Sequence, residues 1–80
     1  MPKNSLPTYA IVELLIRLEK YNDKIGDYKA HAAYDDEVIV KTANGSIIFP
    51  GSLIIRQFES PQLIADNELA AIAGLFKTMQ

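Results

Sequence analysis

The chain has 80 residues, a formal net charge of −2 and no cysteine. The absence of cysteine excludes disulfides, thiolate catalysis and cysteine-based zinc sites, and nothing in the sequence requires an oxidising compartment, so we expect a cytoplasmic protein. The 8 basic and 10 acidic residues are mixed along the chain and no apolar run approaches the length of a membrane span, so neither long-range attraction for nucleic acid nor a membrane location is expected. One domain over residues 1–80 is predicted, and because so short a chain is 49% hydrophobic, some apolar surface should remain outside its core.

A helix is predicted from Pro7-Thr8 to about Tyr21, after a flexible arm over residues 1–6. Apolar residues recur there at intervals of three and four, which predicts one buried stripe made of Ile11, Leu14, Leu15, Leu18 and Tyr21. The opposite side is a predicted solvated face that carries Glu13, Arg17 and Lys20. A second apolar stripe, made of Tyr9, Val12 and Ile16, widens the apolar arc beyond what one sheet would cover, so this helix is expected to touch a second surface.

Alternation over residues 28–34 predicts the first strand, with Tyr28, Ala30, Ala32 and Tyr34 on the face that a helix would approach and His31 on the other. The polar group Asp35-Asp36-Glu37 then forms a turn, and whether Asp23 and Asp27 lie near it in space is left open.

The Asn44-Gly45 pair lies between two apolar runs and predicts a hairpin with a two-residue type I′ turn. Such a turn places Thr42 opposite Ile47 and Val40 opposite Phe49. The predicted core side of this hairpin consists of Val38, Val40, Thr42, Ile47 and Phe49. The reverse side shows Ile39, Lys41 and Ile48, which is more apolar than a purely solvated surface usually is.

After the hairpin, Pro50-Gly51 predicts a type II turn, and residues 53–58 are a fourth strand or a short helix. A last helix is expected to begin at Ser60-Pro61 or at Asp66. Its buried stripe would be Ala65, Leu69, Ile72, Phe76 and Met79, and its outer side Asn67, Ala70, Gly74 and Lys77. The predicted fold class is α+β: an N-terminal helix, an antiparallel meander of three to four strands and a C-terminal helix, with both helices on one face of the sheet.

The residue types that carry chemistry are sparse. His31 is the single histidine, and its place in a strand favours a surface or half-buried role over catalysis. The acidic turn at residues 35–37 lacks the spacing of a calcium loop and is interpreted as solvation, with cation binding left open. No glycine pattern forms a phosphate cradle. We therefore expect no catalytic residue, no metal site and no cofactor, and a small metal-dependent or acid-base enzyme is the last alternative.

The order of one helix, three strands and one helix is similar to that of a double-stranded RNA-binding domain, which implies nucleic-acid binding as the second alternative. That family places lysines at the start of its last helix, whereas this chain has Ser60-Pro61-Gln62 and Asp66-Asn67-Glu68 there, and a fourth strand would also depart from the family's order. The remaining basic row consists of Arg17, Lys20 and Lys24, and a solvated face is the favoured interpretation of it.

Three surfaces carry more apolar or small side chains than one subunit needs. Two helices cover one face of a sheet, which leaves the other face for a partner. The sequence thus predicts a non-catalytic protein-protein interaction module (an adaptor, an accessory subunit or a small inhibitor of a larger protein), with a symmetric homodimer as the expected assembly. The predicted partner-binding residues are Tyr9, Val12, Ile16, Ile39, Lys41, Ile48, Ala70 and Gly74.

Overall fold

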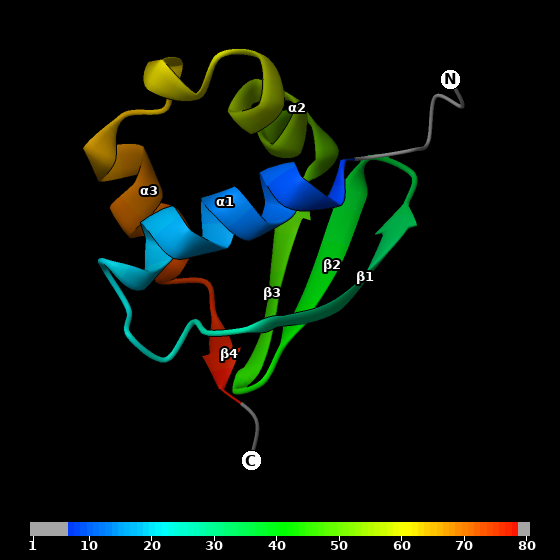
Figure 1. The fold of residues 1–80 in the computed structure, drawn as a ribbon, viewed down its shortest axis with the longest axis vertical. Helices are drawn as coiled ribbons and strands as arrows, with labels where there is room; N and C mark the ends of the chain where they lie inside the picture. Colours follow the sequence, from blue (N-terminus) through cyan, green and yellow to red (C-terminus); the bar gives the residue numbers. More distant parts are fainter. Residues whose placement is uncertain (1–6, 79–80) are drawn as a thin grey trace.

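The computed structural model describes residues 7–78, so the arm predicted over residues 1–6 and the position of Met79 lie outside the described residues. The elements follow one another along the chain as Figure 1 labels them. In order they are α1 (Thr8–Glu19), β1 (Tyr28–Tyr34), β2 (Glu37–Thr42), β3 (Gly45–Pro50), α2 (Gly51–Glu59), the short 3₁₀ helix η1 (Pro61–Leu63), α3 (Asp66–Ala73) and β4 (Lys77–Thr78).

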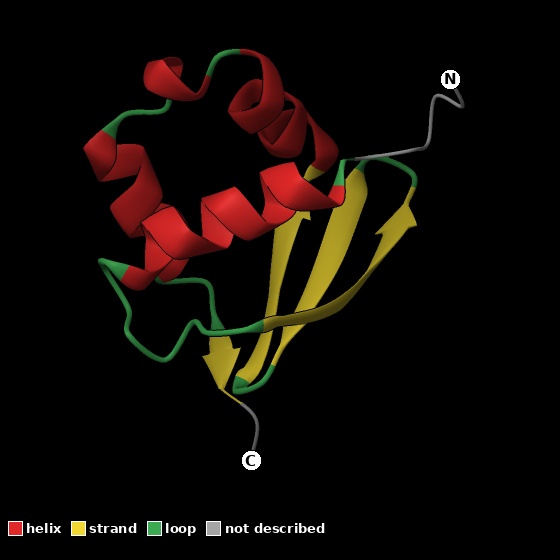
Figure 2. Ribbon diagram, viewed as in Figure 1, coloured by secondary structure: helices red, strands yellow, loops and turns green. Residues whose placement is uncertain are grey.

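The strands form one antiparallel sheet in the order β1-β2-β3-β4, and the helices form a second layer against one of its faces (Figure 2). The predicted α+β meander with its helices on one face is thereby confirmed. The side of the sheet toward the helices is called the core face below, and the opposite side the outer face.

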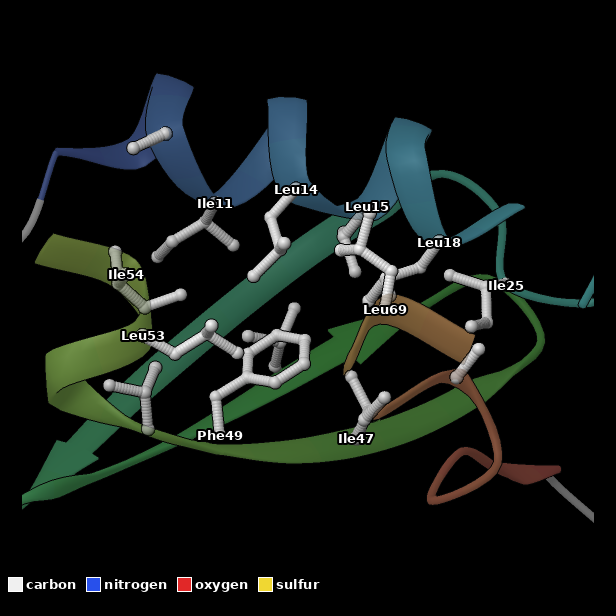
Figure 3. Packing of buried hydrophobic residues seen from close by; sticks show 14 of the residues in the cluster. Ile11, Leu14, Leu15, Leu18, Ile25, Ile47, Phe49, Leu53, Ile54 and Leu69 are labelled. Carbon is white, nitrogen blue, oxygen red and sulfur yellow. The ribbon is translucent and has the colours of Figure 1, made fainter. Parts of the chain in front are cut away.

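The core fills the space between α1 and the sheet. The predicted stripe of α1 is buried, except that Tyr21 lies just past the helix and is half-buried. Phe49 is fully buried and projects from β3 toward the helices (Figure 3). The other two α-helices complete this core with Leu53 and Ile54 of α2 and Leu69 of α3. Since these contacts come from elements far apart in the chain, the helical layer and the sheet stabilise each other.

The predicted turn of the central hairpin is wrong, although its faces are right. The loop residues are Ala43 and Asn44, Lys41 pairs with Ser46, and within residues 7–78 no glycine has a positive φ. The observed register differs from the predicted one by two residues, an even number, so every side chain keeps its face. The predicted core side is buried as expected.

Gly45 is glycine for a long-range reason and not for the turn. A Cβ at this position would overlap the backbone carbonyl oxygen of Lys77 and lie 2.9 Å from the Phe76 ring. The turn itself is held by the buried Thr42 hydroxyl, which accepts hydrogen bonds from the backbone N–H groups of Asn44 and Gly45, each at 3.2 Å. Among residues 7–78, the residue with a positive φ is Asp35, at 53°, in the turn between β1 and β2.

A bulge between Tyr28 and Ala30 corrects the predicted faces of β1. Tyr28 pairs with Thr42 and His31 with Val40, so both lie on the core face, and the prediction that His31 lies opposite Tyr28 is wrong. The outer face of β1 consists of Ala30, Ala32 and Tyr34, so the alanines predicted to admit a helix point away from the helical layer.

Residues 53–58, for which the sequence allows a strand or a short helix, belong to the helix α2, so the strand alternative is wrong. Leu53, Ile54 and Gln57 form its buried side, a spacing that suits a helix. Pro50 is the residue before α2, and because Gly51 has no positive φ, the predicted type II turn is also wrong.

The last helix is shorter than predicted. It ends at Ala73, and the fourth strand is Lys77–Thr78, which pairs with Gly45 and Ser46. Lys77 therefore lies on a strand and does not complement the dipole of a helix. Phe76 packs against the core from outside the helix, which brings the chain back to the sheet.

Candidate protein-binding surface

Strand register arranges the outer face in three rows across the sheet. Residues paired across neighbouring strands stand side by side, and alternate positions along each strand share a face. The rows are an acidic row of Tyr34, Glu37 and Pro50, an apolar row of Ala32, Ile39 and Ile48, and a basic row of Ala30, Lys41, Ser46 and Lys77. The structure thus brings together the predicted Ile39, Lys41 and Ile48, with Ile39 and Ile48 as direct neighbours.

In the described part of the chain, no helix lies against this outer face (Figures 1 and 2). Tyr34 is 61% exposed and Ile48 43% exposed, while Ile39 is half-buried. A hollow of about 470 Å³ runs beside Ile39, Ile48 and Pro50, and the exposed Leu75 forms part of its wall. A smaller hollow of about 260 Å³ lies between Tyr34 and Ile39. The outer face is therefore an accessible, uneven and partly apolar surface.

The charges of the outer face are separated along the strands. At one end Lys29, Lys41 and Lys77 surround a hollow of about 440 Å³. At the other end Glu37 belongs to the face, and Asp35 and Asp36 form the adjoining turn. Four residues separate Glu37 from Lys41 along β2, which is roughly 13 Å at the ordinary rise of a strand. The face consequently presents a negative end, an apolar centre and a positive end.

One edge of the sheet adjoins this surface. Within residues 7–78, β4 pairs only with Gly45 and Ser46, so the rest of β3 borders the larger hollow without a neighbouring strand. An edge strand of this kind carries backbone donors and acceptors that another chain can pair with.

The other predicted partner-binding residues lie in the helical layer. Tyr9 and Ile16 are exposed on α1 and Val12 is half-buried. The Tyr9 ring contacts Phe58 of α2 edge to face, with centroids 5.7 Å apart, so this stripe partly serves the packing of two helices. Ala70 and Gly74 are exposed at the C-terminal end of α3. The eight predicted residues therefore belong to three separate surfaces.

Arg17 is not part of a solvated face, contrary to the prediction. Its Nη1 donates to Gln57 Oε1 at 2.6 Å and to the Pro61 carbonyl at 3.1 Å, and its Nη2 donates to the Ile64 carbonyl at 3.3 Å. Arg17 thus holds α1 against α2 and η1. The predicted basic row loses this guanidinium, which weakens the case for nucleic acid on α1.

Two further polar pairs also hold parts of the fold together. The Tyr28 hydroxyl and His31 Nδ1 are 2.7 Å apart, a pairing that follows from the bulge in β1. The Arg56–Glu68 ion pair, at 2.8 Å, joins α2 to α3, and the hydrogen bond from Arg56 holds the pKa of Glu68 below its ordinary value.

The acidic residues do not gather. The Asp27 carbonyl accepts from the Ala43 N–H at the end of the sheet opposite the turn formed by Asp35 and Asp36, so Asp27 does not lie near that turn. Among residues 7–78, no three His, Asp or Glu side chains are grouped so as to hold a metal ion.

Comparison of the chain with protein-family models, curated proteins and solved structures found no match. No helix within residues 7–78 has the length and apolar character that crossing a membrane requires.

Proposed function

We propose that this protein acts by binding another protein through the outer face of its sheet, without catalysis. The supporting observation is the apolar row, which no helix of the described chain covers. A one-layer sheet face in a small domain is normally polar when it faces water. Isoleucines at its centre, with charges at both ends, match the anatomy of a protein interface, which has an apolar middle and a polar rim.

The exposed part of Ile48 sets the scale of the binding free energy that covering the apolar row can supply. Burying a whole isoleucine side chain stabilises by about 1.5–3 kcal/mol, so covering the 43% that is exposed gives roughly 0.6–1.3 kcal/mol. This corresponds to about a three- to ninefold change in affinity. An aspartate at the same position would in addition bury a charge, so Ile48→Asp should weaken binding by more than about tenfold.

The chain offers a matched control for that substitution. Ile55 on α2 is 45% exposed, nearly as much as Ile48, but belongs to the helical layer. Ile48→Asp and Ile55→Asp therefore introduce the same charge at similar exposure on opposite sides of the molecule. A second variant, Ile48→Thr, keeps a residue that suits a strand and guards against a folding defect.

The experiment compares complexes formed by the wild type and these variants, with sedimentation velocity for self-association and quantitative mass spectrometry after affinity capture for other partners. Thermal unfolding confirms that each variant is folded. Complexes lost in both Ile48 variants and retained in Ile55→Asp support the proposal. Complexes that survive all three substitutions would show that the outer face is not the binding surface.

Nucleic acid is the second candidate, because three lysines surround the hollow at the basic end. The acidic end lies only roughly 13 Å away along the strands and would repel a continuing phosphate backbone. If this candidate is right, a short RNA duplex will bind with strong salt dependence, and Lys41→Ala with Lys77→Ala will weaken it. The control is Lys20→Ala, which removes one positive charge at the C-cap of α1, away from this hollow.

A further inference from the structure

We infer that the partner of the outer face is a second copy of this chain, packed face to face with its strands antiparallel to those of the first. This inference rests on the proposed function, because it names the occupant of the same surface. The observation that carries it is the order of the three rows, acidic, apolar and basic, along the strands.

A two-fold axis makes both copies use the same surface, so each contact occurs twice. When two sheets pack face to face with their strands aligned, the two-fold axis lies between them and runs either along the strands or across them. An axis along the strands sets like ends together, so that Lys41 meets Lys41 and Glu37 meets Glu37. An axis across the strands sets opposite ends together, so that Lys41 meets Glu37 twice. Charge therefore selects the second arrangement.

The spacing of the rows also suits this axis. Ile39 lies midway between Glu37 and Lys41 on β2, two residues or roughly 7 Å from each. A rotation about the apolar row therefore superposes the acidic row of one copy on the basic row of the other. Ile39 and Ile48 then face their own counterparts, so the apolar row closes on itself.

Side-chain size agrees with the same rotation. β1 of one copy lies over β1 of the other, so Tyr34, which is 61% exposed in the acidic row, lies over Ala30 in the basic row. A large ring opposite an alanine allows two sheets to approach to the usual separation of about 10 Å with interdigitated side chains. The axis along the strands would instead place Tyr34 over Pro50.

The size of the face predicts a weak dimer. Three strands at about 4.8 Å with six residues each at about 3.4 Å, together with the two residues of β4, give a flat footprint of roughly 330 Å² per copy. This is below the ~800 Å² of accessible surface per partner that is typical of stable complexes. Dissociation constants of about 1–100 μM are therefore expected, and association will depend on protein concentration.

Charge reversal on the two ends tests the orientation. Glu37→Lys and Lys41→Glu each place two pairs of like charges across the antiparallel interface, so each variant should dimerise at least tenfold more weakly than the wild type at about 0.1 M salt. Glu37 and Lys41 are themselves roughly 13 Å apart within one copy, beyond the screening length of about 10 Å at 0.1 M salt. The double variant Glu37→Lys/Lys41→Glu and an equimolar mixture of the two single variants both restore opposite charges and should recover dimerisation to within about threefold.

The measurement is sedimentation equilibrium from about 10 to 500 μM, with fluorescence transfer between labelled single variants for the mixture and thermal unfolding as the folding control. The inference is supported if the single variants dimerise more weakly than the wild type and if the double variant and the mixture recover dimerisation. Single variants that dimerise as well as the wild type would overturn the antiparallel arrangement, and a monomeric wild type at 500 μM would overturn the second copy as occupant. If either of these results is found but Ile48→Asp still loses a complex with a different protein, the proposed function stands without the homodimer. If Ile48→Asp affects no complex at all, both the proposed function and the homodimer are refuted.

Discussion

Arg17 provides the sharpest test of how the helical layer is held together. Its guanidinium makes three hydrogen bonds, to Gln57 Oε1 and to the carbonyls of Pro61 and Ile64, and the Gln57 side chain is only 6% exposed. The substitution Arg17→Met keeps much of the apolar stem of this side chain but removes every donor.

Two terms set the expected loss of stability. A hydrogen bond to a charged group contributes about 1.5–3 kcal/mol, and a buried acceptor left without a partner costs about 1–3 kcal/mol. Because Arg17 is half-buried and water reaches part of the site, we expect Arg17→Met to lower the free energy of unfolding by about 2 kcal/mol. For a domain of this size that is a fall in Tm of roughly 8–16 °C.

Urea denaturation followed by circular dichroism measures this change, and two further variants make it specific. Lys20→Met removes an exposed cation at the C-cap of the same helix and should cost about 0.5 kcal/mol or less. In Arg17→Met/Gln57→Leu both polar partners are replaced, so the loss should be at least about 1 kcal/mol smaller than the sum of the single losses. Equal effects of Arg17→Met and Lys20→Met, or strictly additive losses, would refute the role given to Arg17.

Two other predictions concern β4 and the ion pair of the helical layer. Gly45→Ala forces a Cβ against the Lys77 backbone and should destabilise the protein by about 1–3 kcal/mol. The control is Gly74→Ala, where the atom nearest to the new Cβ would be the Ala71 carbonyl oxygen at 3.3 Å, so this variant should be neutral or mildly stabilising. Equal effects of the two substitutions in chemical denaturation would contradict this account of Gly45. Arg56→Ala removes the hydrogen bond that lowers the pKa of Glu68, so an NMR titration should find this pKa raised toward its ordinary value. A carboxyl group whose pKa is lower in the folded than in the unfolded state stabilises the fold at pH values above its unfolded-state pKa. That stabilisation is lost as the pH falls through the folded-state pKa. The wild type should therefore be more stable than Arg56→Ala at neutral pH, and this difference should vanish in acid.

The predictable parts of the fold are those whose signals are local. The stripe of α1 follows from spacing within 11 residues, and the two faces of the central hairpin follow from alternation of Val38 to Thr42 with Ile47 to Phe49. The outer-face isoleucines were found by the same alternation. A register error of two residues did not matter for them, because side chains in a strand alternate with a period of two.

The unpredicted parts depend on contacts between distant residues. Gly45 was assigned to a type I′ turn because Asn-Gly usually forms one, but its use is the close approach of Lys77. β4 has two residues, too few for any periodicity, and exists through pairing with Gly45 and Ser46. The bulge in β1 has no sequence signal in Tyr28-Lys29-Ala30, yet it decides that Tyr34 and Ala30 join the outer face. Arg17 was placed on a solvated face because its partners on α2 and η1 come 40 and 44 residues later.

The contrast between the two faces of β2 supports the proposal that the outer face binds a partner. Val38 and Val40 are buried against the helical layer, so their apolar surface already stabilises the fold. Ile39 lies between them in the chain but on the other face, and with Ile48 it leaves apolar surface in contact with water. Threonine would suit a strand at these positions and expose less apolar area. The exposed part of each isoleucine stays in contact with water in the monomer, and it is stabilising only when another surface excludes water from the apolar row.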